Sequence, residues 1–299
     1  MAILVVGSVA LDSIETPFGK AENVLGGSAT YFSVSASFFT PVNLVAVVGE
    51  DFPKKHILFL KKRGVDTKGL EIADGNTFRW KGKYDYDFNN AATIYTRLNV
   101  FEHFRPKIPQ EYKRSGLLFL ANIDPDLQLA VMKQVEKPKL TACDTMNYWI
   151  INKKRSVIEV AKKVDIFLLN EAEARQLSGE SNLLKAGRSI LRLGPKKVVI
   201  KKGEHGVLLF SHGSIFSAPA YLLEMINDPT GAGDTFAGGF IGYLGKRGKI
   251  TDSEIKKGII YGTVMASYAV EDFSLRRLSS ITIRDIERRY KDYERLTRV

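Results

Sequence analysis

Short apolar runs alternate with segments of helical periodicity along most of this sequence. Residues 2–7 (AILVVG), 42–49 (VNLVAVVG) and 165–170 (DIFLLN) are examples of the runs, and residues 52–64 show the helical pattern that follows one of them. Strands that are apolar on both faces belong to parallel sheets with helices on both sides. We therefore predict an α/β fold, a doubly wound, mostly parallel sheet flanked by helices, as a single domain over residues 1–299.

One region breaks this alternation. Residues 70–100 contain an Asp-Gly turn, strict alternation at residues 83–88 (KYDYDF) and no helical period, which indicates an antiparallel ribbon. Residues 12–24 carry turn signals at Pro17 and Gly19. We expect the two segments to form a small antiparallel sheet, a lid with little core of its own. It must rest on substrate, the parent domain or a second subunit, although a simple cover for the sheet edge is an alternative.

The net charge of +11 suggests an anionic partner, which could be nucleic acid, a membrane surface or a phosphorylated small molecule. The basic residues occur mostly in pairs beside acidic residues, as on a solvated surface, and we find no nucleic-acid-binding signature. No apolar run approaches the roughly 18 residues that span a bilayer. We expect neither nucleic-acid nor membrane binding. Cys143 is the one cysteine, and the N-terminal run lacks the basic start of a signal peptide, so a cytoplasmic location is expected.

The segment NDPTGAGDTFAGGF, residues 227–240, places glycines where the chain enters a helix. The first turn of a helix has unpaired backbone N–H groups and a partial positive charge. Glycine also lets the main chain approach an anion closely. The pattern predicts a phosphate-sized anion site built from three backbone amides, those of Gly231, Ala232 and Gly233.

Asp234 follows this site directly, although a carboxylate there would repel a bound phosphate. Its position makes sense if it faces an attacking hydroxyl. The transition state of phosphoryl transfer is loose, so a weak, well-placed base is sufficient. The structural alternative is that Asp234 only complements the helix dipole and the glycines only form a turn. Gly238 and Gly239, inside the helix, are each less favourable than alanine by up to about 1 kcal/mol, which suggests close approach of another backbone or a ligand.

This segment resembles the C-terminal signature of the ribokinase-like (PfkB) family of carbohydrate and nucleoside kinases. Other segments resemble family motifs, and they keep the family's order over nearly the whole chain: VVGSVALD, GGSATYFSVSASFF, VNLVAVVGEDFP, LLNEAEA and VVIKKGEHGV. The resemblance implies a ribokinase-like fold and an ATP-dependent kinase that uses Mg²⁺. It also includes members that dimerise through their lid sheets, so we expect a homodimer.

The resemblance implies roles for individual residues on the acceptor and phosphoryl sides. Asp234 would be the general base, with Gly231, Ala232 and Gly233 as the anion hole for the transferred phosphoryl group. Asp12 would bind substrate hydroxyls. The rest of the acceptor pocket would come from the start of the first helix: Gly26, Gly27 and Ser28.

On the nucleotide side, Asn170 and Glu173 would act on the ATP phosphates through Mg²⁺ and water, while Lys201 and Gly203 would lie along the nucleotide. Positions 228 and 230 match those that hold a monovalent cation such as K⁺ in some members: Asp228 and Thr230. Each residue also has a structural interpretation. Asn170 and Glu173, for example, have the spacing of a helix capping box. It is the joint occurrence of the motifs that favours function.

The sequence departs from the family pattern near the substrate. The asparagine usual after the glycine pair is missing from GGSATYFS, where Ser28, Tyr31 and Ser33 stand instead, and DTMNYWI lacks an arginine that is frequent in fructokinase-like members. The lid is rich in aromatic residues: Phe78, Trp80, Tyr84, Tyr86, Phe88 and Tyr95. They could stack on a nucleobase, pack on a sugar or enter a dimer contact, and the dimer contact is our expectation.

We therefore predict an ATP-dependent phosphotransferase that phosphorylates a hydroxyl of a small polyol, with a sugar as the first interpretation. The aromatic lid supports an alternative, a nucleoside kinase of the same fold. A catalytically inactive ligand-binding or regulatory relative is a second alternative, although a sensor has no need of a base such as Asp234. A nucleic-acid binder, suggested by net charge alone, is a third.

Overall fold

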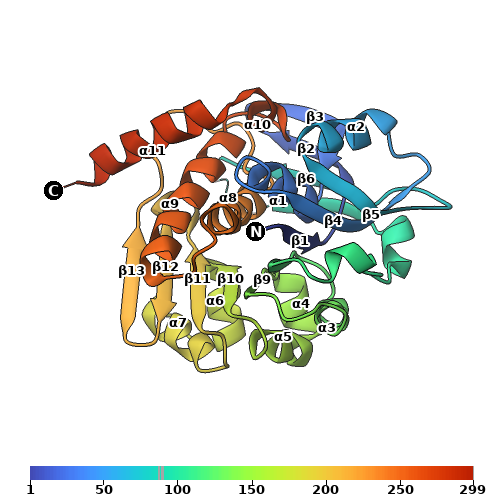
Figure 1. Cartoon of the computed structure of the whole chain (residues 1–299). Helices are drawn as coiled ribbons and strands as arrows, with labels where there is room; N and C mark the ends of the chain where they lie inside the picture. Colours follow the sequence, from blue (N-terminus) through green and yellow to red (C-terminus); the bar gives the residue numbers. More distant parts are fainter. Residues whose placement is uncertain (87, 89–90, 299) are drawn as a thin grey trace.

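A nine-stranded sheet forms the centre of the protein in a computed structural model that describes residues 1–86, 88 and 91–298 (Figure 1). The strand order is β13-β12-β11-β10-β9-β8-β1-β4-β5, and every pairing from β11 to β5 is parallel. Its strands are β1 (Ile3–Val6), β4 (Val42–Gly49), β5 (Val65–Ala73), β8 (Leu117–Leu120), β9 (Leu140–Cys143), β10 (Ile166–Asn170), β11 (Lys197–Lys201), β12 (Val207–Ser211) and β13 (Ser214–Ala218). The antiparallel hairpin β12–β13 completes one edge. The predicted doubly wound, mostly parallel sheet is confirmed.

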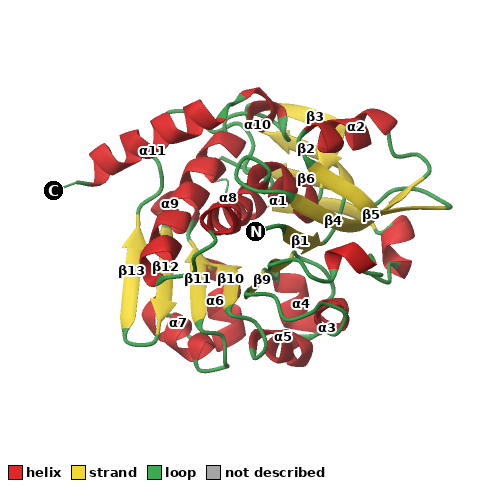
Figure 2. Ribbon diagram, in the orientation of Figure 1, coloured by secondary structure: helices red, strands yellow, loops and turns green. Residues whose placement is uncertain are grey.

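Helices cover both faces of this sheet (Figure 2). Ile3 and Val5 of β1 face one helical layer, and Leu4 and Val6 face the other, because successive side chains of a strand point to opposite faces. The first layer comprises α1 (Ser28–Ala36), α2 (Lys54–Lys62), α8 (Ala232–Arg247), α9 (Asp252–Ala269), α10 (Arg276–Ser280) and α11 (Ile283–Thr297). The second comprises α3 (Pro125–Met132), α4 (Asn147–Asn152), α5 (Lys154–Ala161), α6 (Glu171–Ser178) and α7 (Leu183–Leu191). In the described part of the chain, no helix has both the length and the apolar character to cross a bilayer.

A separate four-stranded sheet forms the lid, in the order β3-β2-β6-β7. Its strands are β2 (Ala10–Thr16), β3 (Gly19–Gly26), β6 (Arg79–Tyr84) and β7 (Ala91–Arg97). The β2–β3 and β6–β7 pairs are antiparallel, as predicted, whereas β2 and β6 pair in parallel. The lid therefore joins two hairpins that lie far apart in the sequence.

Two boundaries of the predicted ribbon differ from the structure. Residues 70–73 belong to β5, which pairs with β4 at the edge of the large sheet. Much of this edge strand is exposed, which accounts for its polar residues. The alternating segment 83–88 was expected to be strand throughout, but β6 ends at Tyr84. Asp87 lies outside the described residues, and Tyr86 belongs to a turn.

The lid rests on the parent domain, one of the three supports expected for it. The Thr16 hydroxyl donates to the carbonyl oxygen of Asn227 at 2.9 Å, and the Tyr84 and Thr230 hydroxyl oxygens lie 3.3 Å apart. Phe273, which follows α9, packs with Ile14 beneath the lid. The lid therefore contacts the chain that leads into α8.

Helices α1 and α8 approach closely enough for backbone contact. A Cβ atom added at Gly238 would lie 2.4 Å from the carbonyl oxygen of Phe32, and one at Gly242 would lie 2.9 Å from Cα of Ala36. On the other side of α8, a Cβ at Gly239 would lie 2.7 Å from Cγ of Met265 in α9. The close approach expected at Gly238 and Gly239 is confirmed.

Gly238→Ala should destabilise the fold by about 1–3 kcal/mol, because the new methyl group has no space against Phe32 and overpacking outweighs the gain in helix propensity. Denaturant unfolding followed by circular dichroism measures this change. Lys246→Ala, at an exposed position of the same helix, should stay within about 0.5 kcal/mol of the parent. If Gly238→Ala had the same free energy of unfolding as the parent, α1 and α8 would be able to move apart without destabilising the fold.

Candidate active site

Three neighbouring strands end at the same edge of the large sheet and bring polar side chains together there. Asp144 follows β9 directly, Asn170 ends β10 and Lys201 ends β11, and Asn170 and Lys201 are paired in register. Ligands of open α/β sheets bind outside the carboxyl ends of the strands. Asp144 was not among the predicted site residues, although its position immediately after an apolar run is a signal that could have identified it.

Asn170 and Glu173 form a complete capping box at the start of α6. The Asn170 side chain accepts a hydrogen bond from the Glu173 N–H at 2.8 Å, and Glu173 Oε2 accepts one from the Asn170 N–H at 2.7 Å. Glu173 is 5% exposed. The structural role considered from the sequence is therefore real, and the capping bond uses Oε2 of the carboxylate, which leaves Oε1 outside the capping box.

Lys201 connects the strand edge to the first turn of α8. Its ammonium group forms an ion pair with Asp144, and both side chains are largely buried. A Cβ atom added at Gly233 would lie 3.1 Å from Lys201 Nζ. The positive charge of Lys201 therefore stands beside the glycine-rich segment, where sequence reasoning had placed it only along the nucleotide.

The entry to α8 has the geometry of a partly open amide cluster. Gly231 precedes the helix in the left-handed conformation with φ of 73°, and a Cβ there would lie 2.4 Å from the ring of Tyr31. The N–H groups of Gly231 and Gly233 have no hydrogen-bond partner among the described residues. The Ala232 N–H donates to the carbonyl oxygen of Pro229 at 3.2 Å, so it differs from the expectation that all three amides are unpaired.

Asp228 and Thr230 hold the loop before α8 in place. The two carboxylate oxygens of Asp228, which is fully buried, accept hydrogen bonds from the backbone N–H groups of Thr230 at 2.8 Å and Ser274 at 3.0 Å. The Thr230 hydroxyl contacts the Tyr84 hydroxyl of the lid. These contacts give both residues a structural role, and the assignment of this pair to a monovalent cation stays a prediction.

Asp12 and the glycine pair form the acceptor side. Asp12 Oδ2 accepts a hydrogen bond from the Gly27 N–H at 3.3 Å, and a Cβ at Gly26 would lie only 1.9 Å from the same oxygen. Gly27 has φ of 94°, a conformation that other residues rarely adopt. The Ser28 hydroxyl lies 3.0 Å from that of Ser8, so this side chain connects the start of α1 to the segment that follows β1.

The acidic groups of this region repel one another and are poorly solvated. Burial raises the pKa of Asp234 to about 7, with a further increase from Asp144 and an opposing effect from Lys201. Burial also raises the pKa of Asp12 to about 7, and the Gly27 hydrogen bond opposes this while Asp228 and Asp234 add to it. An acid that titrates near neutral pH is suited to accept a proton at that pH.

The nucleotide side shows the same competition between burial and charge. Burial raises the pKa of Glu173 to about 8 against the lowering effect of Lys201. For Lys201, burial opposes the charged form, but Asp144 and Glu173 outweigh it and raise the pKa. Lys201 therefore carries a positive charge among three acidic residues, Asp144, Glu173 and Asp234.

The arrangement fits a Mg²⁺ ion that arrives with a nucleotide. Among residues 1–86, 88 and 91–298, no group of three His, Cys, Asp or Glu side chains could hold a metal ion. Nucleotide-bound Mg²⁺ needs only one or two protein carboxylates, because phosphates and waters complete its shell. Glu173 Oε1 is available for that purpose. Gly203 lies in an exposed 3₁₀ turn, η3 (Gly203–His205), beyond the end of β11.

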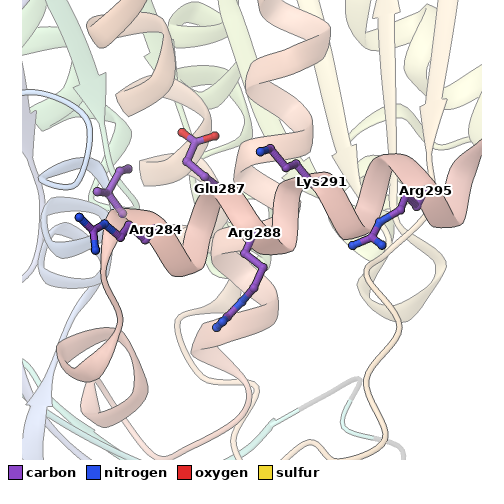
Figure 3. Close-up of a pocket in the computed structure, with 6 residues that line it drawn as sticks. Arg284, Glu287, Arg288, Lys291 and Arg295 are labelled. Carbon is purple, nitrogen blue, oxygen red and sulfur yellow. The ribbon is translucent and has the colours of Figure 1, made fainter.

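A depression of about 340 Å³ lies elsewhere, along α11 (Figure 3). Six residues of that helix line it, and most are basic: Ile283, Arg284, Glu287, Arg288, Lys291 and Arg295. None of them belongs to the cluster at the sheet edge. Arg288 and Arg295 are already paired with acids of the same helix, Asp285 and Asp292, so the depression adds nothing to the phosphate site.

Comparison with known proteins now identifies the family. The profile of the pfkB family carbohydrate kinases matches residues 3–280, nearly the whole chain. This chain belongs to the PfkB family. The predicted family and fold class are thus confirmed, and the PfkB-family protein is a kinase.

Individual PfkB relatives differ in what they act on. The chain is 31% identical to a cytidine kinase of Thermococcus kodakarensis over 264 residues, which cover 86% of this chain and 93% of the relative. It is 25% identical to a ribokinase of Lactococcus lactis, over 84% of this chain and 86% of that one. A putative ribokinase II from E. coli, solved in complex with ATP and Mg²⁺, has the same fold with a TM-score of 0.78, 19% identity and coverage of 97% and 99%.

Proposed function

We propose that this protein is an ATP-dependent nucleoside kinase that transfers the γ-phosphoryl group to a ribose hydroxyl. The observation that carries the kinase chemistry is Asp234 beside the unpaired amides of Gly231 and Gly233, with Lys201 against the same turn. The 31% identity to a cytidine kinase favours a nucleoside over a free sugar as the acceptor. This reverses the order of the two interpretations drawn from the sequence.

Asp234 is the general base in this proposal. The acceptor oxygen forms a bond to the γ-phosphorus while the bond from that phosphorus to the β,γ-bridging oxygen breaks, and ADP leaves. The proton of the acceptor hydroxyl passes to the Asp234 carboxylate late in the step. The Gly231 and Gly233 amides, together with Lys201, stabilise the charge that gathers on the moving phosphoryl oxygens.

The remaining residues bind and orient the reactants. Asp12 accepts hydrogen bonds from the ribose hydroxyls, next to the glycine pair. Asn170 and Glu173 orient the nucleotide phosphates, Glu173 through water on Mg²⁺, and Gly203 lies along the nucleotide. Bound Mg²⁺ neutralises charge on the phosphates. No step in this proposal involves a monovalent cation.

The lid closes over the acceptor and excludes water, so that ATP is not simply hydrolysed. Dimerisation through the lid stays a prediction. It is motivated by apolar side chains on that sheet, such as Phe18 at 53% and Ile94 at 54% exposure, and by the free edge of β7.

A panel of nucleosides and sugars tests the proposal. Each compound is incubated with Mg²⁺ and ATP, ADP formation is followed, and the product is identified by mass. We expect a nucleoside, with cytidine as the first candidate, to be phosphorylated with a kcat/KM at least tenfold above that of ribose. Phosphorylation of a sugar without any nucleoside would restore the sugar-kinase interpretation, and ligand binding without any product would favour the inactive relative.

The turnover rate should depend on pH through Asp234. The base acts only when it is deprotonated, and its pKa is raised to about 7 by burial and Asp144. We expect kcat to be highest above pH 7 and to fall about tenfold for each unit below it, as the carboxylate takes up a proton. Steady-state kinetics from pH 5.5 to 9 measures this. A rate that is flat down to pH 5.5 would contradict a base with this pKa.

A further inference from the structure

The aromatic residues of the lid do not act as one surface. Phe78 stacks on Phe101 with ring centroids 5.3 Å apart, and Tyr95 lies under the Arg97 guanidinium at 4.9 Å. Two more gather around Phe18 at the turn end of the lid: Tyr86 and Phe88. Trp80 and Tyr84 remain, and both pack on the body-facing side of the lid against Ile14 and Phe273.

Trp80 lies beside Asp12 on that face. The two residues are partners in the parallel pairing of β2 and β6, so their side chains emerge on the same side of the sheet. Ile14, two residues along β2, is 1% exposed, which identifies this side as the one that covers the protein body. Trp80 is therefore the cross-strand neighbour of the residue whose carboxylate we assign to the ribose hydroxyls, and its ring extends from there over Gly82 toward Thr93 of β7.

The indole ring is held in one orientation by two neighbours. A Cβ atom added at Gly82 would lie 2.2 Å from both Cη2 and Cζ2 of Trp80, so the ring extends across a position that only glycine leaves open. The Trp80 Nε1–H donates to the Thr93 hydroxyl of β7 at 3.2 Å. Trp80 is still partly exposed, although Tyr84 and Ile14 pack around it.

A nucleoside has the matching outline, because its ribose carries hydroxyl groups and its base offers an apolar, aromatic face. A free sugar can also pack on an aromatic ring, but a flat nucleobase covers more of an indole than a furanose does, so the ring favours the base. We propose that Trp80 is the stacking platform for the nucleobase and so determines specificity for nucleosides over sugars. This inference rests on the proposed function and assigns a residue to one part of it.

The two tryptophans of the chain, Trp80 and Trp149, make the contact directly observable. In a Trp149→Phe protein, the emission comes from Trp80 alone. We expect cytidine to quench or shift that emission with a saturation curve that matches its KM, and D-ribose at the same concentrations to have no effect. Trp149 belongs to α4 and bonds Asn122, outside the lid, so this background should retain phosphorylation of cytidine.

Kinetics of lid variants provide the second arm. Trp80→Leu should raise the KM for cytidine roughly 10- to 100-fold, the range expected for loss of one base–aromatic stack. Trp80→Phe, which retains a ring, should recover most of that loss. Gly82→Ala, which must displace the indole, should act like Trp80→Leu. The KM for ATP and the kcat/KM for D-ribose should stay within twofold of the parent in all three variants.

The outcomes separate two kinds of failure. Phosphorylation of ribose but no nucleoside by the parent protein would overturn the proposed function and the stacking role with it. Phosphorylation of cytidine together with an unchanged cytidine KM in Trp80→Leu, or a silent Trp80 emission, would overturn the stacking role alone. A parallel rise of the KM values for cytidine and ATP would show that Trp80 only supports the fold of the lid.

Discussion

Asp234→Asn should lower kcat by roughly 10²- to 10⁴-fold, the range for loss of a positioned base. Asparagine preserves the size of the side chain but cannot accept the proton of the acceptor hydroxyl. The first turn of α8 and the ion pair of Lys201 with Asp144 should remain, so ATP affinity and thermal stability should change little. Steady-state assays, calorimetric titration with ATP and thermal melts measure the three quantities.

Asp252→Asn is the matched control. Asp252 begins α9, is 72% exposed and is paired with Lys197, so the same chemical change there should leave kcat within twofold. If Asp234→Asn retained a kcat within tenfold of the parent, Asp234 would not be the base, and the first turn of α8 would have to act through its amides alone.

Lys201→Met should have the second largest effect, a fall in kcat of roughly 10²- to 10³-fold, as for the loss of a donor to the transition state. The substitution removes the positive charge beside Gly233 and leaves Asp144 buried without its partner. Because Lys201 lowers the pKa of Asp234, its loss should also shift the midpoint of the pH–rate profile upward. A combined rate and pH study therefore distinguishes an electrostatic role from simple misfolding.

Lys196→Met provides the comparison. Lys196 immediately precedes the same strand, is 77% exposed and pairs with Asp165, so its loss should change neither kcat nor the pH midpoint. A Lys201→Met protein with reduced kcat but an unmoved midpoint would show that Lys201 does not act on Asp234.

The parts of the fold that follow local patterns could be predicted from the sequence. Runs such as residues 42–49 are apolar on both faces, and a central parallel strand requires that. The glycines at positions 238 and 239 indicated close packing of α8, and the structure supplies Phe32 and Met265 as the partners. In these cases, the residue type alone indicates whether the position is buried or closely packed.

Features that depend on distant partners could not be predicted. The polar residues of β5 suggested an antiparallel ribbon. An exposed edge strand of a large sheet shows the same alternation of polar and apolar residues as a ribbon does. Asp144 and Lys201 meet only because β9, β10 and β11 are neighbours in the sheet, an order that the sequence does not state. The Ala232 amide turns to Pro229 through loop geometry that residue types do not reveal.

The contact between Gly238 and Phe32 links two helices that begin on the two sides of the proposed reaction. Helix α1 starts at the glycine pair beside Asp12, and α8 starts at the amides beside Asp234. Since their backbones touch, neither helix can slide along the other without a clash. In the proposed reaction, this contact would keep the acceptor side and the amide cluster at a constant separation, and closure of the lid would control access to the space between them.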